Sequence, residues 1–224
     1  MTFSIVAKCA DSGQFGVAIS SSSLCVAARC AFVRAQVGAV ASQNITDPRL
    51  GTLALDLMAH GKSARQARDE IVQATANIDY RQLLIIDSLG QVAQFSGSNT
   101  LGINHLAEAD HALAAGNLLK TPEVPQAMID GFLATRGEKL GTRLIVALNA
   151  GLKAGGEAGP LASAGMLIAD NQEWPLADLR VDKSSDPIGD LSALWHDWKP
   201  EMDAYVTRAI TPDQAPSYGV PGDE

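Results

Sequence analysis

The second residue of the chain, Thr2, has the chemistry of a nucleophile if it becomes the N-terminus. Aminopeptidases remove an initiator Met when a small residue follows it, and Thr2 is small. A threonine with a free α-amine carries a general base beside its own hydroxyl, so the hydroxyl can attack a carbonyl carbon. The sequence therefore predicts a catalytic Thr2 after removal of Met1. The alternative is that Met1 is retained and Thr2 is a strand residue with ordinary β propensity.

A β-hairpin is predicted to hold Thr2 in place. Its first strand alternates apolar side chains from Phe3 to Ala7, and Asp11-Ser12-Gly13 supplies the turn. The returning strand starts at Phe15. Chain termini are usually loose, so a hairpin that begins at the second residue is unusual.

The returning strand ends in a run of four serines at positions 20–23. A turn of two or three residues places Thr2 opposite Ser22 or Ser23. Hydroxyls and backbone amides of Ser21, Ser22 and Ser23 could then orient a reacting carbonyl or bind an oxyanion. The alternative is that the serines are only a polar strand end.

Three more polar side chains are predicted near strand ends. Asn117 follows Gly116 at the end of a strand, where its amide could donate to an oxyanion; the alternative is a turn residue. Gln43 ends the strand predicted for residues 34–43 and is a similar donor. Arg34, at the start of that strand, is either an anchor for a substrate carboxylate or a solvated strand end.

Several function classes are excluded by composition. The net charge is −8 and the pI about 4.9, which argues against nucleic-acid binding. No apolar segment reaches 18 residues and no signal peptide is apparent, so we predict no membrane contact and a cytoplasmic protein. The three cysteines and four histidines have no metal-ligand spacing, and the glycine-rich segment at 155–159 lacks the phosphate-loop pattern. We therefore predict no cofactor and no metal.

The 224 residues suit one large domain or two small ones. Hydrophobic periodicity predicts pairs of antiparallel strands separated by pairs of helices, ending in a helix that Asp186-Pro187 begins. This order favours two stacked antiparallel sheets, each covered by helices. We predict one such domain over residues 1–199 and an extended C-terminal tail over 200–224. The predicted strands are 34–43, 81–87, 91–95, 111–117, 161–169 and 176–181, with a tight crossing or short strand at 24–31 and a loop at 96–104. The predicted helices are 48–60, 63–76, 121–132, 138–152 and 187–198, and a capping box of Ser63 and Gln66 begins the second of them.

Several stretches resemble a bacterial family of unknown function that is classed as Ntn-hydrolase-like, some of whose members are described as associated with the RidA family. The most specific stretches are Thr2-Phe-Ser-Ile-Val-Ala7 and Leu179-Arg-Val-Asp182. Others are Gly16-Val-Ala18, Arg34 with Gly38-Ala-Val-Ala-Ser-Gln43, Arg81-Gln-Leu83, Gly116-Asn-Leu-Leu119, Gly155-Gly156 and Asp186-Pro187. The resemblance covers most of the chain. Ser22 and the segment 157–162 depart from the residues that many members carry.

The resemblance implies a four-layer αββα sandwich of the α+β class and, by the logic of the superfamily, an N-terminal nucleophile at Thr2. Together with the residues above, it predicts a hydrolase of a small amide or related C–N bond. The alternative is a non-catalytic ligand-binding or assembly module of the same fold. The predicted partner is a small-molecule substrate. The oligomeric state is open, with a homo-oligomer among the options.

Overall fold

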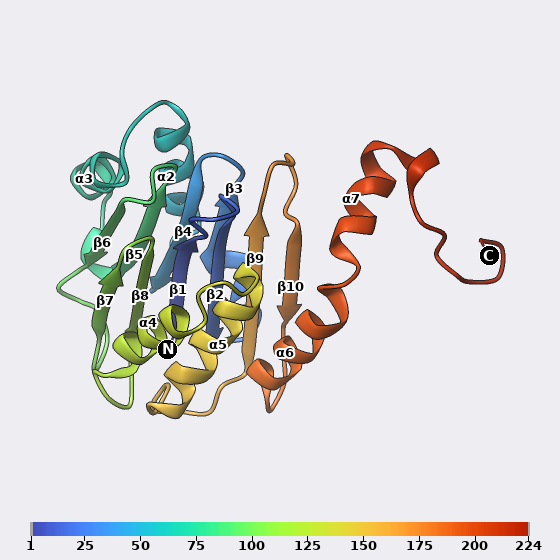
Figure 1. Ribbon diagram of the computed structural model, residues 1–224. Helices are drawn as coiled ribbons and strands as arrows, with labels where there is room; N and C mark the ends of the chain where they lie inside the picture. The colour runs from blue at the N-terminus through green and yellow to red at the C-terminus, as the bar shows by residue number, and fades with distance from the viewer. Residues whose placement is uncertain (1, 224) are drawn as a thin grey trace.

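The computed structural model describes residues 2–223 and contains two antiparallel sheets that pack face to face (Figure 1). The six-stranded sheet has the order β10-β9-β2-β1-β8-β7. Its strands are β1 (Thr2–Lys8), β2 (Phe15–Ser21), β7 (His105–Ala109), β8 (Ala112–Asn117), β9 (Ser163–Ala169) and β10 (Ala177–Val181). The four-stranded sheet has the order β3-β4-β5-β6. Its strands are β3 (Ala31–Arg34), β4 (Gly38–Asn44), β5 (Arg81–Asp87) and β6 (Val92–Ser96).

Helices cover the outer face of each sheet, so the predicted four-layer αββα sandwich is confirmed. The six-stranded sheet is covered by α4 (Val124–Ala134), α5 (Leu140–Lys153) and α6 (Pro187–Trp198). The four-stranded sheet is covered by α2 (Arg49–Ala59) and α3 (Ala64–Ala74). The predicted capping box of Ser63 and Gln66 begins α3, and Asp186 caps α6 by accepting the Gly189 N–H.

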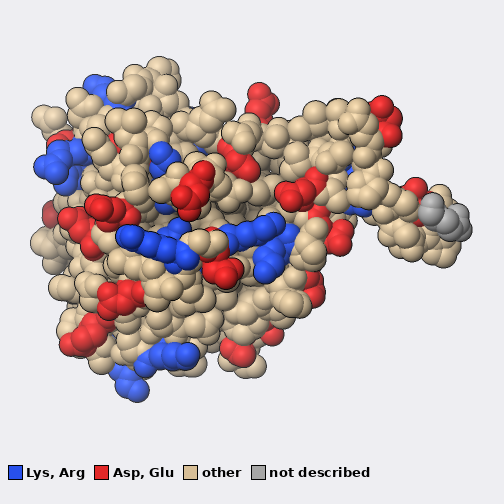
Figure 2. Space-filling view, viewed as in Figure 1, with Lys and Arg blue, Asp and Glu red and all other residues tan. Residues whose placement is uncertain are grey.

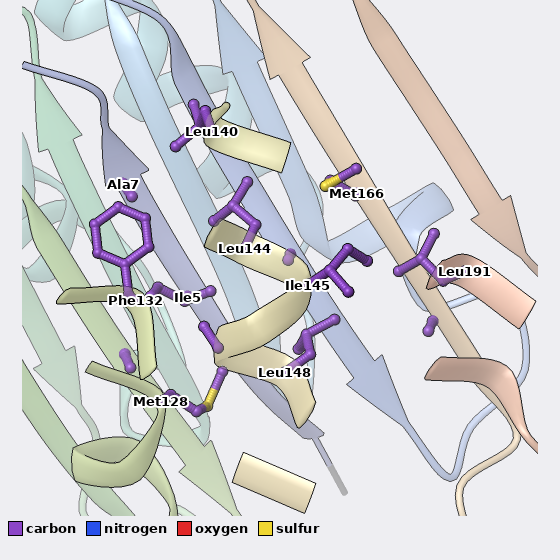
Figure 3. Close-up of a cluster of buried hydrophobic side chains, with 14 of the residues drawn as sticks. Ile5, Ala7, Met128, Phe132, Leu140, Leu144, Ile145, Leu148, Met166 and Leu191 are labelled. Carbon is purple, nitrogen blue, oxygen red and sulfur yellow. The ribbon is translucent and has the colours of Figure 1, made fainter. Parts of the chain in front are cut away.

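Three apolar clusters hold the layers together. Figure 3 shows part of the cluster beneath α4 and α5, which contains Phe132 of α4, Leu144 of α5 and Ile5 of β1. A second cluster lies between the two sheets and includes Val17, Leu84 and Leu113. Strand alternation therefore assigns each β1 side chain to one of two layers. Phe3 and Ile5 face the helices, whereas Val6 faces the other sheet.

Four predicted elements differ from the structure. The single strand predicted for residues 34–43 is the hairpin of β3 and β4, with its turn at 35–37, because Gln36 adopts a positive φ that breaks the strand. The segment 24–31, predicted as a crossing or short strand, contains the helical turn α1 (Ala27–Cys30). Strand β7 lies where only a loop and the approach to a strand were predicted. Helix α4 begins at Val124, later than predicted, with Pro125 in its first turn.

The C-terminal segment contains a helix that the sequence analysis did not predict. Helix α7 (Met202–Ile210) leads away from the sandwich in Figure 1 and is followed by the 3₁₀ turn Pro212–Gln214. Met202 is buried against the cluster beneath α6, whereas Tyr205 stacks on Trp198 with ring centroids 5.0 Å apart. The segment is thus helical over Met202–Ile210 rather than extended.

Candidate functional site

Polar side chains replace apolar ones at one end of the space between the sheets. Each of these polar residues is an even number of positions from an apolar residue of the inter-sheet cluster on the same strand. Because side chains alternate between the two faces of a strand, the polar side chains also point into the space between the sheets. The residues are Thr2 and Ser4 on β1, Ser21 on β2, Asn117 on β8, Ser163 on β9, Gln43 on β4 and Gln82 on β5. We call this set the polar layer. All seven side chains are at most 5% exposed.

Thr2 is the first residue of β1, an inner strand of the six-stranded sheet. It is paired with Asn117 in the β1–β8 ladder, and its Oγ1 lies 3.3 Å from Ser21 Oγ. Thr2, Asn117 and Ser21 therefore share one site. The predicted removal of Met1 concerns a residue that lies outside the described residues.

The predicted register of the first hairpin was wrong. Phe3 pairs with Ser20, which brings Ser21 rather than Ser22 or Ser23 beside Thr2. The reason is a longer turn: the Cys9 N–H donates to the Gln14 carbonyl at 2.8 Å, so the turn between this pair contains four residues (10–13) rather than two or three.

Ser22 and Ser23 leave the strand and turn away from Thr2. The Ser23 N–H donates to Ser21 Oγ at 3.0 Å, while its carbonyl accepts from Ser163 Oγ at 2.6 Å. The Ser22 N–H donates to both carboxyl oxygens of Glu157, each at 3.1 Å. Of the three serines whose backbone amides the sequence suggested as oxyanion donors, Ser22 and Ser23 thus have N–H groups that are already hydrogen-bonded to side chains.

Gln82 joins the amides of the polar layer into one network. Its Oε1 accepts from Gln43 Nε2 at 2.7 Å and from Asn117 Nδ2 at 3.1 Å. Its Nε2 donates to Ser96 Oγ and to the Gly116 carbonyl. Ser4 Oγ donates to Gln43 Oε1 at 2.7 Å, which ties β1 to the other sheet. The network fixes the orientation of each amide.

Asn117 has one atom outside this network. Its Oδ1 is buried and has no hydrogen-bond partner among the described residues. A buried acceptor without a donor is costly, which marks it as a group that a ligand or water would satisfy. The free position at Asn117 Oδ1 accepts a hydrogen bond, so it suits an N–H or ammonium group rather than an oxyanion.

Glu157 is a buried carboxyl beside the polar layer, and the sequence analysis did not select it. It lies after Gly155 and Gly156, whose φ values of +127° and +59° form a tight turn that glycine tolerates. Glu157 is 5% exposed, and no Lys or Arg within residues 2–223 forms an ion pair with it. Burial raises its pKa to about 7, although hydrogen bonds from Ser22 favour the charged form.

Arg34 does not belong to this site. It lies at the opposite end of the β3–β4 hairpin from Gln43, paired with Gly38, and its guanidinium forms an ion pair with Asp56 at 2.8 Å.

The structure thus brings together Thr2, Ser21, Gln43 and Asn117, with Ser22 and Ser23 at the edge. Gln82 was missed, although its even spacing from Leu84 and Ile86 is a signal visible in the sequence.

No group of three or more His, Cys, Asp or Glu residues is placed to hold a metal ion within residues 2–223. The three cysteines are reduced; Cys9 and Cys30 are buried, whereas Cys25 is exposed. Within the same range, no helix is long and apolar enough to cross a membrane.

These observations define a class of protein: a four-layer sandwich with a site of hydroxyl and amide groups at the start of β1. The profile of a family of unknown function, DUF1028, matches residues 2–191, and the chain belongs to this family. The crystal structure of protein SPO2555 from Silicibacter pomeroyi, also assigned to DUF1028, has 31% sequence identity. The match covers 88% of this chain and 85% of that one, with a TM-score of 0.82.

Weaker structural similarity extends to Anbu, the ancestral β-subunit. Anbu from Yersinia bercovieri has 10% identity and a TM-score of 0.39, covering 91% of this chain and 97% of that one. An Anbu mutant from Hyphomicrobium sp. strain MC1 has 11% identity and a TM-score of 0.42, covering 90% and 96%. The curated proteins contain no match.

Proposed function

We propose that the protein is an N-terminal-nucleophile hydrolase of a small amide or related C–N bond, with Thr2 as the nucleophile after removal of Met1. One observation carries the proposal. Thr2 Oγ1 lies at the start of an inner strand, 5% exposed, 3.3 Å from Ser21 Oγ and in register with Asn117. A hydroxyl in such a dry polar environment is positioned by its neighbours rather than by water.

In the proposed reaction, Thr2 Oγ forms a bond to the carbonyl carbon and its proton passes to the Thr2 α-amine, directly or through a water. The C–N bond then breaks, and the leaving nitrogen takes that proton. Water hydrolyses the resulting ester and restores the hydroxyl. Free α-amines have a pKa near 7.7–8.0, and burial lowers the pKa of an amine, so the proposed base is a buried α-amine that is largely neutral near pH 7 and accepts the hydroxyl proton.

Roles for the neighbouring groups follow from their unused hydrogen-bonding positions and from their pKa values. Asn117 Oδ1, which has no hydrogen-bond donor among residues 2–223, would accept an N–H of the α-amine or of the substrate amide. Burial raises the pKa of Glu157 to about 7, so part of the Glu157 carboxyls are protonated at neutral pH, and that protonated form would donate toward the oxyanion or the leaving group. Gln43 acts through Gln82 by fixing the orientation of Asn117.

The second candidate is the non-catalytic module, a fold that binds a ligand or assembles without reacting. The observation that favours it is that the Ser22 and Ser23 N–H groups are already hydrogen-bonded within the protein. An oxyanion would have to displace these bonds. The two candidates differ in one chemical requirement, which is a free amine on Thr2.

The test begins with the intact mass of the purified protein, which reports whether Met1 is removed. Processed protein is then screened against small amides, N-carbamoyl compounds and short peptides. Thr2→Ala should abolish any activity found, whereas Thr52→Ala, an exposed threonine on α2, should retain it. Activity that survives in Thr2→Ala would place the nucleophile elsewhere. A retained Met1 with no activity would favour the binding module.

Three further predictions accompany this proposal. We expect a cytoplasmic protein, which fractionation of the source cells would test. Homo-oligomer formation is tested by light scattering of the purified chain. The resemblance also suggests an association with the RidA family, which is tested by co-purification with a RidA-family protein.

A further inference from the structure

The far end of the six-stranded sheet from Thr2 contains a cavity of about 290 Å³. Its walls come from the end of β1 and the turn that follows, from the turn between β7 and β8 that contains Asp110 and His111, and from the facing ends of α4 and α5 with their connection. Lys8, Arg136 and Arg143 contribute three cationic side chains to it. Figure 2 shows Lys and Arg side chains gathered across the middle of this face, over the region where α4 leads into α5. At about 3.3 Å per residue, β1 separates this cavity from Thr2 by roughly 20 Å.

Arg143 is the buried member of the three. It lies on α5, is 6% exposed, and its guanidinium lies 3.8 Å over the ring of Phe132. Its hydrogen bonds, from Nε and Nη2, both go to the Phe132 carbonyl oxygen at the long distance of 3.4 Å. The packing therefore holds the planar group in one orientation without using its full capacity to donate.

The charge of Arg143 has no carboxylate partner. No Asp or Glu in the described part of the chain forms an ion pair with it, and burial lowers its pKa. Of the groups that can carry a negative charge, the Cys9 thiol, which hydrogen-bonds with Arg143, and the Asp11 carboxylate both favour the charged guanidinium. Burial opposes ionisation of the thiol, but hydrogen bonds with Ser12 and Asp11 and the charge of Arg143 together lower the Cys9 pKa. A buried cation without a partner is costly, so an anion from solution would be stabilised there.

The remaining charges decide what size of anion fits. Lys8 and Arg136 add positive charge at the rim, and Lys8 Nζ is held by the Ser88 carbonyl at 2.7 Å. Asp11 and Asp110 also line the cavity, and both are exposed. These two carboxylates repel a large polyanion at the mouth, whereas a small anion can pass them and reach Arg143.

We propose that this cavity binds a small oxyanion, a carboxylate or phosphate group, with Arg143 as the main ligand and Lys8 and Arg136 beside it. A guanidinium presents parallel N–H donors that match two oxygens of such a group. The site is separate from Thr2, and its existence does not depend on the proposed hydrolase.

Calorimetric titration of the full chain tests the site, with inorganic phosphate and acetate as separate probes at constant ionic strength. We expect saturable binding of at least one probe. Arg143→Met keeps the bulk over Phe132 but removes the charge, and it should weaken binding by about tenfold or more. Lys139→Met is the matched control, because Lys139 is an exposed cation in the same connection but does not line this cavity, and it should leave binding unchanged.

Binding of neither probe to the wild-type chain would overturn the proposal, as would binding that Arg143→Met leaves unchanged. If Arg143→Met does not fold, the rim variant Lys8→Met/Arg136→Ala provides the test. Both of its side chains are at least partly exposed, so folding should persist. That variant should weaken binding several-fold, and unchanged binding there would also contradict the site.

Discussion

The two ends of β1 bury charge and polarity in opposite ways. At the Thr2 end, hydroxyls and amides from both sheets hydrogen-bond to one another, and the adjacent titratable group is the carboxyl of Glu157. At the Lys8 end, the buried group is the cation of Arg143, over an aromatic ring and a cavity. Neither Glu157 nor Arg143 has an oppositely charged partner within residues 2–223.

The buried polar groups at the two ends of β1 come from different kinds of element. The polar layer lies on strands whose ladders fix every backbone position, so its geometry follows from register. Glu157 comes from a glycine turn and Arg143 from a helix. Buried ionisable groups without partners reduce stability, and such groups are concentrated at functional sites. A contribution to stability therefore does not explain Glu157 and Arg143, and a functional role is the better explanation for both.

The largest expected effect concerns activity at the Thr2 end. Thr2→Ala should lower kcat/KM for any substrate found by about 10³-fold or more, because the nucleophile is lost. Thr2→Ser should retain part of the activity, since a hydroxyl remains beside the amine. Lys8→Met, at the other end of the same strand, should leave activity unchanged. Loss of activity in Lys8→Met would contradict the separation of the two ends.

A second effect concerns the stability of the polar layer. Gln82→Ala removes the group that accepts from Gln43 and Asn117 and donates to Ser96, leaving several buried groups unsatisfied. We expect a loss of about 3–5 kcal/mol in the free energy of unfolding by denaturant titration. Gln126→Ala, an exposed control on α4, should change it by less than about 0.5 kcal/mol. A small loss for Gln82→Ala would mean that water replaces the network.

A third effect is a pH dependence that belongs to Glu157. Its pKa is about 7 in the folded protein and lower when unfolded, so the folded state binds the proton more tightly. The contribution of Glu157 to the free energy of unfolding is therefore greatest below about pH 4.5. It falls as the pH rises to about 7, by an amount on the order of 3 kcal/mol at most. Glu157→Gln should remove this dependence in urea unfolding at pH 5 and pH 8. Glu173→Gln, an exposed control, should keep it; an unchanged slope in Glu157→Gln would refute the assignment.

The layered fold was predictable because it depends on local patterns. The alternation from Phe3 to Ala7 and the capping box at Ser63 are signals within a few residues, and both are present in the structure. Strand β7 was missed because its central residues alternate weakly, with Ala107 between the more exposed Leu106 and Glu108. The β3–β4 turn was missed because a left-handed Gln36 has no sequence signal as strong as glycine.

The candidate site was predictable only where one hairpin determines it. The proximity of Thr2 to the serine run follows from a hairpin, although a longer turn than predicted changed its partner to Ser21. The contact of Asn117 with Gln82 joins residues from different sheets, and local patterns do not predict such pairing. Glu157 and Arg143 are recognisable only from burial without a partner, a property of the folded chain.

The smallest expected effect separates function from stability at the Lys8 end. Arg143→Met loses the contact with the Phe132 ring and two long hydrogen bonds but also removes an unpaired buried charge. These contributions oppose each other, so without added anion the free energy of unfolding should change by less than about 1 kcal/mol. Phosphate at saturating concentration should raise the unfolding midpoint of the wild type but not of Arg143→Met, because only the wild type retains the ligand. Arg136→Met, at the exposed rim, should keep most of the rise. A loss above about 3 kcal/mol in Arg143→Met, with no response of the wild type to phosphate, would make Arg143 a structural residue and remove the contrast between the two ends.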